Sequence, residues 1–513
     1  MSESIVKNLS FGEEGRVKVF EGITKLTQAV SSTLGASGKC VMLEDSSGKP
    51  VITKDGVTVA NSVILLDPVE NMGATLLKEA ARQTVKEAGD GTTTATVLAH
   101  SILKQAFEFD DYGSREIRDG ISSAVDKVIK YLEKESKDVS GDMLYQVATI
   151  SSNNDSELGG IIAKTFEDVG ENGVVSMEIS NDEKTTSQVV NGTSIDKGLK
   201  NLHFVNNKEK GICELNNPLV LVVESKIPNV RKIQSVLEYV IKNKKELLIV
   251  GEADDQVTTA IAMNVVKGNI KANIIDSPDF GINRKQILQD IALLTGATVI
   301  NEDLGDDIDL IDIEHLGTCI KATTDSDETI IQVEEGNKEV EELIENVKKQ
   351  IEETNSNAKK HQLERRLSRL AGRVGVVKVG ANSEVELKEK ADRVEDAICA
   401  TKAAVKEGIL PGGGIALLNA SSKIKGSNRG EELLLEAIKA PFKTIMDNAG
   451  IVEYDEFKRK GFGFNVVDGK EVDMIKAGIV DPLLVTKSAL KNAASVANTI
   501  LSTDCVINNL RVQ

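Results

Sequence analysis

The chain has 513 residues, of which 40% are hydrophobic and 28% are charged. At roughly 150 residues per domain, this length predicts about three domains. The formal charge of −18 argues against nucleic-acid binding, because contacts to phosphate need clustered Lys and Arg.

Cysteine and histidine usage argues against a disulfide framework or a transition-metal site. The five cysteines and four histidines are dispersed, with no Cys-x-x-Cys pair, and this favours reduced thiols. Residues 1–10 lack the features of a signal or transit peptide, and no run approaches the ~20 apolar residues that span a membrane. We therefore expect a cytoplasmic protein with no membrane or nucleic-acid partner.

The first third of the chain is predicted to be mostly helical. Apolar residues recur at helical spacing in residues 13–33 and again in 71–88. Between them, residues 41–43 and 51–53 flank a Gly-Lys-Pro turn and predict a β-hairpin. Gly89 is expected to end the second helix, and Asp90 is placed to cap a third.

The middle third changes to an α/β pattern. Strand-like runs at 219–223, 247–250, 273–275 and 298–300 alternate with helical segments, which predicts a compact unit with a largely parallel sheet. Two charged amphipathic helices are then expected at 340–351 and 363–370, as an antiparallel pair joined near 355–357. From Val385 onward the sequence returns to helices.

Gly89-Asp90-Gly91-Thr92-Thr93-Thr94 is the most informative local segment. Its glycines let backbone N–H groups approach a phosphate, and the start of the following helix favours negative charge. The threonine hydroxyls can donate to phosphate oxygens, while a carboxylate is a suitable Mg²⁺ ligand. A glycine-ended helix followed by a capped one explains the same residues without a ligand. The Walker A pattern is absent.

Three further segments admit a functional and a structural interpretation. Thr33-Leu34-Gly35 can offer backbone contacts to a ligand, and Thr53-Lys54-Asp55-Gly56 sets an ammonium beside a carboxylate. Gly412-Gly413-Gly414 precedes a helical run, so it is either an anion or adenosine contact or a flexible linker. Asp396, considered alone, is typical of a solvated charge on a helix.

Three functions remain compatible with these features. An ATPase would use the glycine loops and carboxylates. A dinucleotide-dependent enzyme would use the α/β unit, but residues 224–228 follow its first strand without Gly-x-Gly-x-x-Gly. A passive binding scaffold would use apolar grooves alone.

The order of the motifs separates these alternatives. The chain resembles the group I (bacterial, GroEL-like) chaperonins from about residue 8 to 508, with no inserted helical lid. The matching segments are Thr33-Leu34-Gly35, Thr53-Lys54-Asp55-Gly56, Glu70-Asn71-Met72-Gly73-Ala74, Gly89–Leu98, Leu370-Ala371-Gly372, Lys378-Val379-Gly380-Ala381, Arg393-Val394-Glu395-Asp396-Ala397, Gly412-Gly413-Gly414 and Val480-Asp481-Pro482.

The resemblance implies an α+β multidomain subunit with the GroEL-like chaperonin fold. A helical equatorial domain would combine 1–135 with 407–513, a small hinge (intermediate) domain 136–190 with 375–406, and an α/β apical domain would span 191–374. It further implies an ATPase that encloses non-native proteins in a ring of seven subunits, in one ring or two stacked rings, under a heptameric co-chaperonin lid.

Site residues follow from the resemblance motif by motif. Asp90 would bind Mg²⁺, Gly91, Thr92, Thr93 and Thr94 would surround the phosphates, and Lys54 would lie near them and a K⁺ site. Asp55 and Asp396 would polarise the attacking water, with Asp396 delivered by a mobile domain. The remaining ATP contacts would come from Thr33, Leu34, Gly35, Gly413, Gly414, Asn465 and Asp481.

Departures from the family pattern concern the periphery of the site and the client groove. Ala36-Ser37 replaces a usual Pro-Lys, and the chain ends without a Gly-Gly-Met tail. Several predicted client-binding positions are polar or small, although such a groove works by burying apolar surface. We therefore also considered a chaperonin-derived ring with weakened folding activity, acting as a holdase or structural assembly. The predicted client-binding positions are Leu199, His203, Phe204, Gln234, Leu237, Thr258, Ala262 and Met263.

Overall fold

The computed structural model describes residues 7–44, 48–109, 115–139, 141–170, 174–180, 182–208, 210–278, 281–302, 311–334, 338–354, 359, 363, 366–367, 369–452, 457 and 459–509. Contacts divide the chain into two compact units. Unit 1 comprises Met1–Ala163, Ile179–Thr185 and Val379–Gln513, and unit 2 comprises Lys164–Glu178 and Thr186–Lys378. Both units are therefore discontinuous in sequence.

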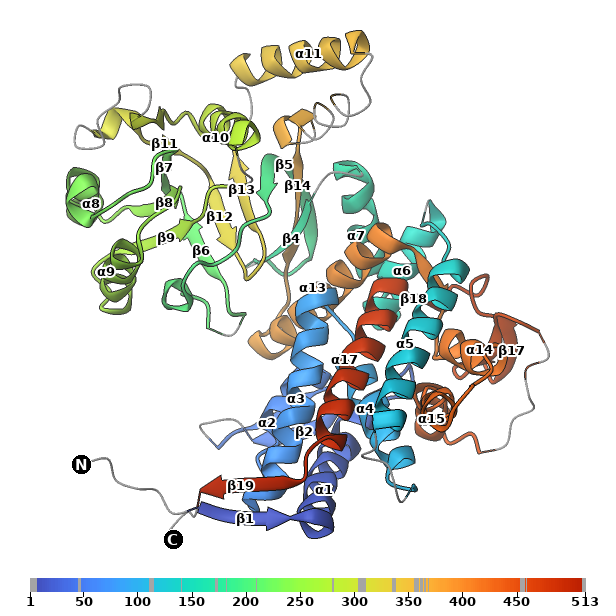
Figure 1. Cartoon of the computed structure of the whole chain (residues 1–513). Coiled ribbons are helices and arrows are strands. Elements are labelled where there is room, and N and C mark those ends of the chain that lie inside the picture. The colour runs from blue at the N-terminus through green and yellow to red at the C-terminus, as the bar shows by residue number, and fades with distance from the viewer. Residues whose placement is uncertain are drawn as a thin grey trace. The chain divides into compact units, whose positions relative to one another are not determined.

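Unit 1 is mainly helical (Figure 1). Its helices are α1 (Gly12–Ser31), α2 (Gly56–Ser62), α3 (Pro68–Ala88), α4 (Thr92–Ala106), α5 (Arg115–Glu135), α6 (Asp142–Ser151), α13 (Glu384–Glu407), α14 (Ile415–Lys423), α15 (Arg429–Ala437), α16 (Ala440–Asn448) and α17 (Leu483–Leu501), and α7 (Ser156–Val169) continues from unit 1 into unit 2. Its strands form antiparallel pairs: β1 (Lys7–Phe11) with β19 (Cys505–Asn509), β2 (Val41–Glu44) with β3 (Pro50–Thr53), β15 (Ile409–Pro411) with β18 (Val480–Pro482), and β16 (Phe462–Asn465) with β17 (Lys470–Asp473).

The two ends of the chain share one hydrophobic core in unit 1. Ile23 and Leu26 on α1, Leu98 on α4, and Leu490 and Ala493 on α17 belong to the same buried cluster. Small residues such as Ala493 allow α17 to pack closely on α3 and α4. The first and last thirds of the sequence therefore form a common scaffold, as the resemblance implies.

Unit 2 contains two sheets. Its strands are β4 (Val174–Ile179), β5 (Thr186–Ile195), β6 (Cys213–Asn216), β7 (Leu219–Val223), β8 (Glu246–Val250), β9 (Lys271–Ile275), β10 (Val299–Ile300), β11 (Gly317–Thr318), β12 (Lys321–Thr324), β13 (Thr329–Val333) and β14 (Arg373–Val379). Its helical segments are η1 (Leu202–Phe204), η2 (Val230–Ile233), α8 (Gln234–Lys242), α9 (Asp255–Val266), α10 (Gly281–Thr295), η5 (Ile313–His315) and α11 (Lys338–Glu353).

The parallel sheet has the order β10-β7-β8-β9, with β11 antiparallel to β7. Its strands are buried on both faces, and their sequences are therefore continuous apolar runs. Leu221 and Ile249 pack in one cluster with α8 and α9, while Val222 and Leu248 pack in another with α10. The second cluster also contains residues of the six-stranded sheet β4-β14-β5-β13-β12-β6.

The strand and helix predictions are confirmed at the level of elements, but the prediction that Asp90 caps the third helix is wrong. Gly91 is the N-cap of α4, without a side-chain cap, and the Asp90 carboxylate accepts from the N–H group of Gly91 instead. The predicted hairpin is β2–β3, the four predicted strands of the middle third are β7 to β10, and α11 is the first of the two charged helices. Leu363 and Leu370 of the second charged segment pack with Val347 of α11, while the predicted joint at 355–357 lies outside the described residues. The division of unit 1 into equatorial and intermediate domains stays a prediction. Among the described residues, no helix combines the length and the apolar character that crossing a membrane requires.

Candidate functional site

A cavity of about 1400 Å³ lies within unit 1. Loops and helix starts that are far apart in the sequence form its lining. Every residue predicted to bind ATP or to catalyse its hydrolysis belongs to that lining: Thr33, Leu34, Gly35, Lys54, Asp55, Asp90, Gly91, Thr92, Thr93, Thr94, Asp396, Gly413, Gly414, Asn465 and Asp481. The segments that each had a purely structural interpretation therefore meet at one place.

The loop between α3 and α4 depends on two glycines with left-handed backbone. Gly89 (φ 74°) ends α3, and Gly91 (φ 99°) precedes the first turn of α4. A Cβ on Gly89 would collide with Cys399, and a Cβ on Gly91 would press against Val485. The loop holds Asp90 and the start of α4 at the cavity wall. The first N–H groups of a helix have no partner within it, so this wall is suited to an anion.

Asp55 is fixed by the helix that it caps. Its carboxylate accepts hydrogen bonds from the backbone N–H groups of Val57 (3.0 Å) and Thr58 (2.7 Å) at the start of α2. The next residue, Gly56, lies so close to the Thr93 hydroxyl that a Cβ there would collide with it. Asp55 and the threonines of α4 are thus held side by side on one wall of the cavity.

The three glycines 412–414 fold against β18 and α16. Because β15 pairs with β18, Leu410 lies opposite Asp481, and the Asp481 carboxylate accepts hydrogen bonds from the N–H groups of Gly413 and Gly414. Gly414 (φ 76°) precedes α14, and a Cβ on it would lie 2.7 Å from the backbone nitrogen of Phe442. The segment is therefore a closely packed turn, and the alternative of a flexible linker is wrong.

Asn448 at the end of α16 supports the cavity wall from outside the lining, and the sequence analysis missed it. Its side-chain amide donates to the carbonyl oxygens of Ser31 (2.8 Å) and Leu34 (2.9 Å). These bonds hold the turn that follows α1, where Gly35 has φ 85°. More than 400 residues separate Asn448 from this turn, so no local pattern indicated the contact.

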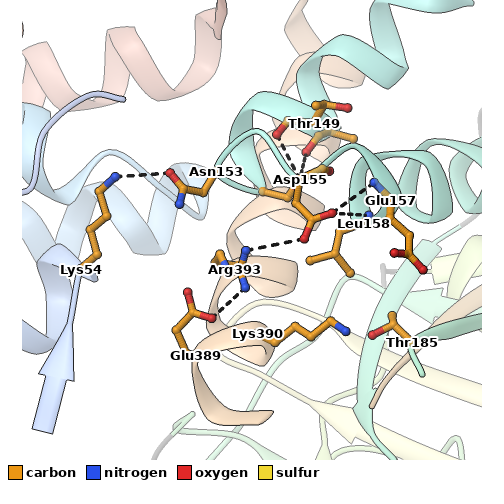
Figure 2. A network of polar contacts seen from close by, with 12 residues as sticks. Lys54, Thr149, Asn153, Asp155, Glu157, Leu158, Thr185, Glu389, Lys390 and Arg393 are labelled. Carbon is orange, nitrogen blue, oxygen red and sulfur yellow. Dashed lines mark hydrogen bonds and ion pairs between the residues drawn. The ribbon is translucent and has the colours of Figure 1, made fainter. Parts of the chain in front are cut away.

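A group of polar contacts links α13 to the residues before α7, and links these residues to Lys54, which follows β3 (Figure 2). Arg393 on α13 forms ion pairs with Glu389 (2.7 Å) and with Asp155 (3.7 Å). Asp155 also caps α7 through the N–H groups of residues 157 and 158. Lys54 donates to the side-chain oxygen of Asn153 at 3.3 Å. These contacts hold α13 in place, and Asp396 on this helix lies at the cavity wall.

Carboxylates crowd the cavity, and burial with mutual repulsion favours their protonated forms. Burial raises the pKa of Asp90, and the nearby charge of Asp55 adds to this. Burial, followed by the charges of Asp90 and Asp55, raises the pKa of Asp396 well above its ordinary value. Burial also raises the pKa of Asp481 to about 6, despite the glycine N–H groups that oppose the shift. A bound cation would relieve this repulsion.

The carboxylates that line the cavity suit Mg²⁺, which takes part of its ligands from phosphates and water, better than they suit a metal bound by protein side chains alone. Among the described parts of the chain, no three His, Cys, Asp or Glu side chains converge on one point. Mg²⁺ is commonly bound by one or two carboxylates together with substrate phosphates and water. Asp90, beside the start of α4, can supply such a carboxylate.

Asn465 lines the cavity, but its side chain is already used within its own hairpin. The amide nitrogen donates to Asp468 (2.7 Å), and the amide oxygen accepts from the N–H group of Val467 (3.0 Å). Asn465 therefore shapes the β16–β17 turn that borders the cavity. An amide nitrogen carries two N–H groups and an amide oxygen two lone pairs, so the Asn465 side chain can contact adenosine while keeping both of these bonds.

The predicted client-binding residues lie in unit 2 around η1, α8 and α9. His203, Gln234 and Met263 are exposed, and Leu199 and Leu237 are half-buried. Phe204, Thr258 and Ala262 are buried, and Phe204 is 0% exposed in the core beneath α9. In this structure these three side chains lie beneath the surface, so a part for them in client binding stays a prediction.

Leu202 is a strongly exposed apolar residue that the prediction missed. Its side chain is 80% exposed, whereas that of Phe204 two residues later is buried. The segment is a single 3₁₀ turn, capped by Asn201, whose side chain accepts from the N–H group of His203. A turn this short has no apolar repeat from which the inward-facing residue can be read.

Comparison with known proteins agrees with the motifs. The sequence model of the TCP-1/cpn60 chaperonin family matches residues 26–511. The fold is similar to that of the chaperonin gp146 from the bacteriophage EL 2 (Pseudomonas aeruginosa), solved in the presence of ATP-BeFx. Its crystal form II gives a TM-score of 0.74 and form I a TM-score of 0.66, each at 22% identity and covering 99% of this chain and 100% of the other.

Proposed function

The chain belongs to the TCP-1/cpn60 chaperonin family, and we propose that it uses Mg-ATP hydrolysis to drive the binding, enclosure and folding of non-native proteins. The observation that carries this proposal is the convergence, in one cavity, of the α4 N-terminus, its threonines and the carboxylates of Asp55, Asp90 and Asp396. The phage relative that shares the fold was crystallised in the presence of ATP-BeFx, which supports a nucleotide in this cavity.

Each residue has a defined part in the proposed reaction. Asp90 would hold Mg²⁺, which when bound neutralises phosphate charge. The N–H groups and hydroxyls of Thr92, Thr93 and Thr94 would orient the phosphates, with Lys54 supplying a positive charge near them and near a K⁺ site. Asp55 and Asp396 would orient and polarise the attacking water. Phosphoryl transfer needs mainly such positioning and electrostatic stabilisation.

We further propose assembly into a ring of seven copies, in one or two layers, that takes a heptameric lid. Two small sheets of unit 1 carry apolar cross-strand pairs with exposed side chains. These are Met42 (69% exposed) with Ile52 (61%) on β2–β3, and Leu9 with Ile507 on β1–β19. Two-stranded sheets are marginally stable in water and have open edges, so a neighbouring copy would stabilise them. Unpaired thiols among the described cysteines support a cytoplasmic location.

The test combines turnover with assembly. Purified protein should hydrolyse ATP only with Mg²⁺, form rings in electron micrographs with and without ATP, and assist refolding of a denatured protein. Met42→Glu should weaken the ring, because it places a charge in the proposed contact, while the exposed Glu44→Gln on the same strand should not. A folded wild-type monomer at micromolar concentration would contradict the ring. Rings without refolding would favour the structural or holdase alternative, which the exposed polar Gln234 and His203 also favour.

Client capture is expected to depend on Leu202 and not directly on Phe204. Leu202→Glu should weaken capture of a denatured protein about tenfold or more, because one well-buried apolar contact contributes about 1.5–3 kcal/mol. The thermal stability of the Leu202→Glu variant should be unchanged. Phe204→Ala should instead lower the free energy of unfolding of unit 2 by about 3–5 kcal/mol. Capture and unfolding measured on both variants separate the roles, and equal capture by Leu202→Glu and wild type would exclude this surface.

A further inference from the structure

The points where the chain passes between the two units are joined to one another inside unit 1. The chain crosses after residues 163, 178, 185 and 378. Next to these crossings, the N–H group of Ser180 donates to the carbonyl oxygen of Val379 (2.8 Å), and the N–H group of Gly380 donates to the Thr185 hydroxyl (3.3 Å). A Cβ on Gly380 would collide with the carbonyl oxygens of Asp182 and Lys184. Three of the crossings therefore converge on the backbone of Gly380.

Lys390 connects this junction to α13. Its ammonium donates to the carbonyl oxygen of Gly380 at 3.1 Å, and Thr185, which is buried, donates its hydroxyl to the same oxygen at 3.5 Å. Figure 2 shows the Lys390 side chain extending from its helix toward Thr185. The side chain is half-buried, so its charge has a defined partner and does not simply face solvent.

Lys390 lies six residues before Asp396 on α13, which is fewer than two helical turns. Arg393, which pairs with Asp155 and Glu389, lies between them. At 1.5 Å of rise per residue, Lys390 and Asp396 are about 9 Å apart along the helix axis. A helix turn is rigid on this scale, so displacement of α13 at Lys390 moves the Asp396 carboxylate with it.

We propose that Lys390 is a positioning residue for ATP hydrolysis, which ties α13 and its Asp396 carboxylate to the backbone junction at Gly380 where the chain enters unit 2. This inference rests on the proposed function of the cavity. The Lys390 ammonium thus has a role in turnover although Lys390 lies outside the cavity lining. Lys390 acts through Asp396 and does not touch the nucleotide.

Lys390→Met keeps the length of the side chain and removes its donor. We expect kcat for ATP to fall about tenfold with KM nearly unchanged, because displacement of a positioned catalytic group lowers the rate of the chemical step. Lys390→Arg should restore most of the rate. Amide hydrogen exchange at Gly380 should be faster in Lys390→Met than in wild type. Lys406→Met, at an exposed position in the last turn of the same helix, is the matched control and should behave like wild type.

Thr185→Val provides an independent variant, since it removes the hydroxyl at the same carbonyl and keeps the side-chain shape. It should reproduce the loss of kcat, which also tests the junction if Lys390→Met does not fold. If wild type is active and either Lys390→Met or Thr185→Val has the same kcat, the positioning role alone is overturned. A rise in KM without loss of kcat, or an equal effect of Lys406→Met, would also overturn it. Wild type without turnover would overturn the proposed function and this role together.

Discussion

Asp396→Asn is expected to lower the rate of ATP hydrolysis by about 10²–10⁴-fold, with ATP affinity nearly unchanged. General bases contribute factors of this size. The side chain lies at the cavity wall, where burial, and then the charges of Asp90 and Asp55, raise its pKa. Asparagine has nearly the same shape but cannot polarise water as a carboxylate does. An interaction needed only in the transition state affects kcat and not ground-state binding. Single-turnover rates and equilibrium ATP binding measure the two quantities separately.

Asp392→Asn is the matched control for this substitution. Asp392 lies one turn earlier on α13 and also lines the cavity, so its replacement removes the same charge from the same space. We expect its turnover to stay within a few-fold of wild type. Equal turnover in wild type and Asp396→Asn would exclude Asp396 as the catalytic carboxylate, and equal losses in both variants would indicate a general charge effect.

Asp396→Asn should also stabilise the protein in the absence of nucleotide. The folded-state pKa of Asp396 is raised above its ordinary value of 3.8. The folded state therefore holds the proton more tightly than the unfolded state, and its stability falls as the pH rises from that value through the folded-state pKa. Asp396→Asn removes this loss and should gain about 0.5–2 kcal/mol at neutral pH. Denaturant unfolding at pH 5 and pH 7.5 should show the gain at the higher pH.

Local chemistry explains which parts of the site the sequence could predict. Gly89 and Gly91 take left-handed backbone at a helix end and a helix start, and Asp55 caps the helix that follows it. Such features depend on neighbouring residues, so their pattern is visible in the chain. The strands of the parallel sheet were equally readable, because burial on both faces requires uninterrupted apolar runs.

Long-range contacts explain what the sequence could not predict. Asn448 bonds to backbone carbonyls more than 400 residues away, and a side chain that donates to a distant carbonyl leaves no periodic signal. Lys390 bonds to Gly380, which is close in sequence but lies outside the helix, so helical periodicity does not indicate that contact either. The client-binding residues were predicted by correspondence of position, which does not report which way a side chain faces in a 3₁₀ turn. Phe204 was therefore assigned to a surface that Leu202 occupies. The hydrogen bonds of Asn465 were readable in principle, since Asn465, Asp468 and Gly469 form a local turn signal.

Asp90→Asn is expected to raise the Mg²⁺ concentration needed for half-maximal ATP binding by about 10–100-fold, the range seen when support for a metal site is lost. Mg²⁺ prefers charged oxygen ligands, and asparagine offers a neutral one. The loop geometry should survive, because the positive backbone angles belong to Gly89 and Gly91. Titration of a fluorescent ATP analogue with Mg²⁺ measures the effect.

The pH dependence of this Mg²⁺ requirement distinguishes a ligand from a neighbouring charge. Burial and the charge of Asp55 raise the pKa of Asp90, so protons compete with Mg²⁺ as the pH falls. Wild type should need more Mg²⁺ at pH 5.5 than at pH 7.5, and Asp90→Asn should lose most of this difference. Asp481 has a pKa of about 6 and is bonded to the glycine N–H groups, so Asp481→Asn should weaken nucleotide binding yet keep a wild-type Mg²⁺ midpoint at pH 7.5. If Asp90→Asn keeps the wild-type midpoint at both pH values, Asp90 does not bind the metal, because a lost ligand must shift it.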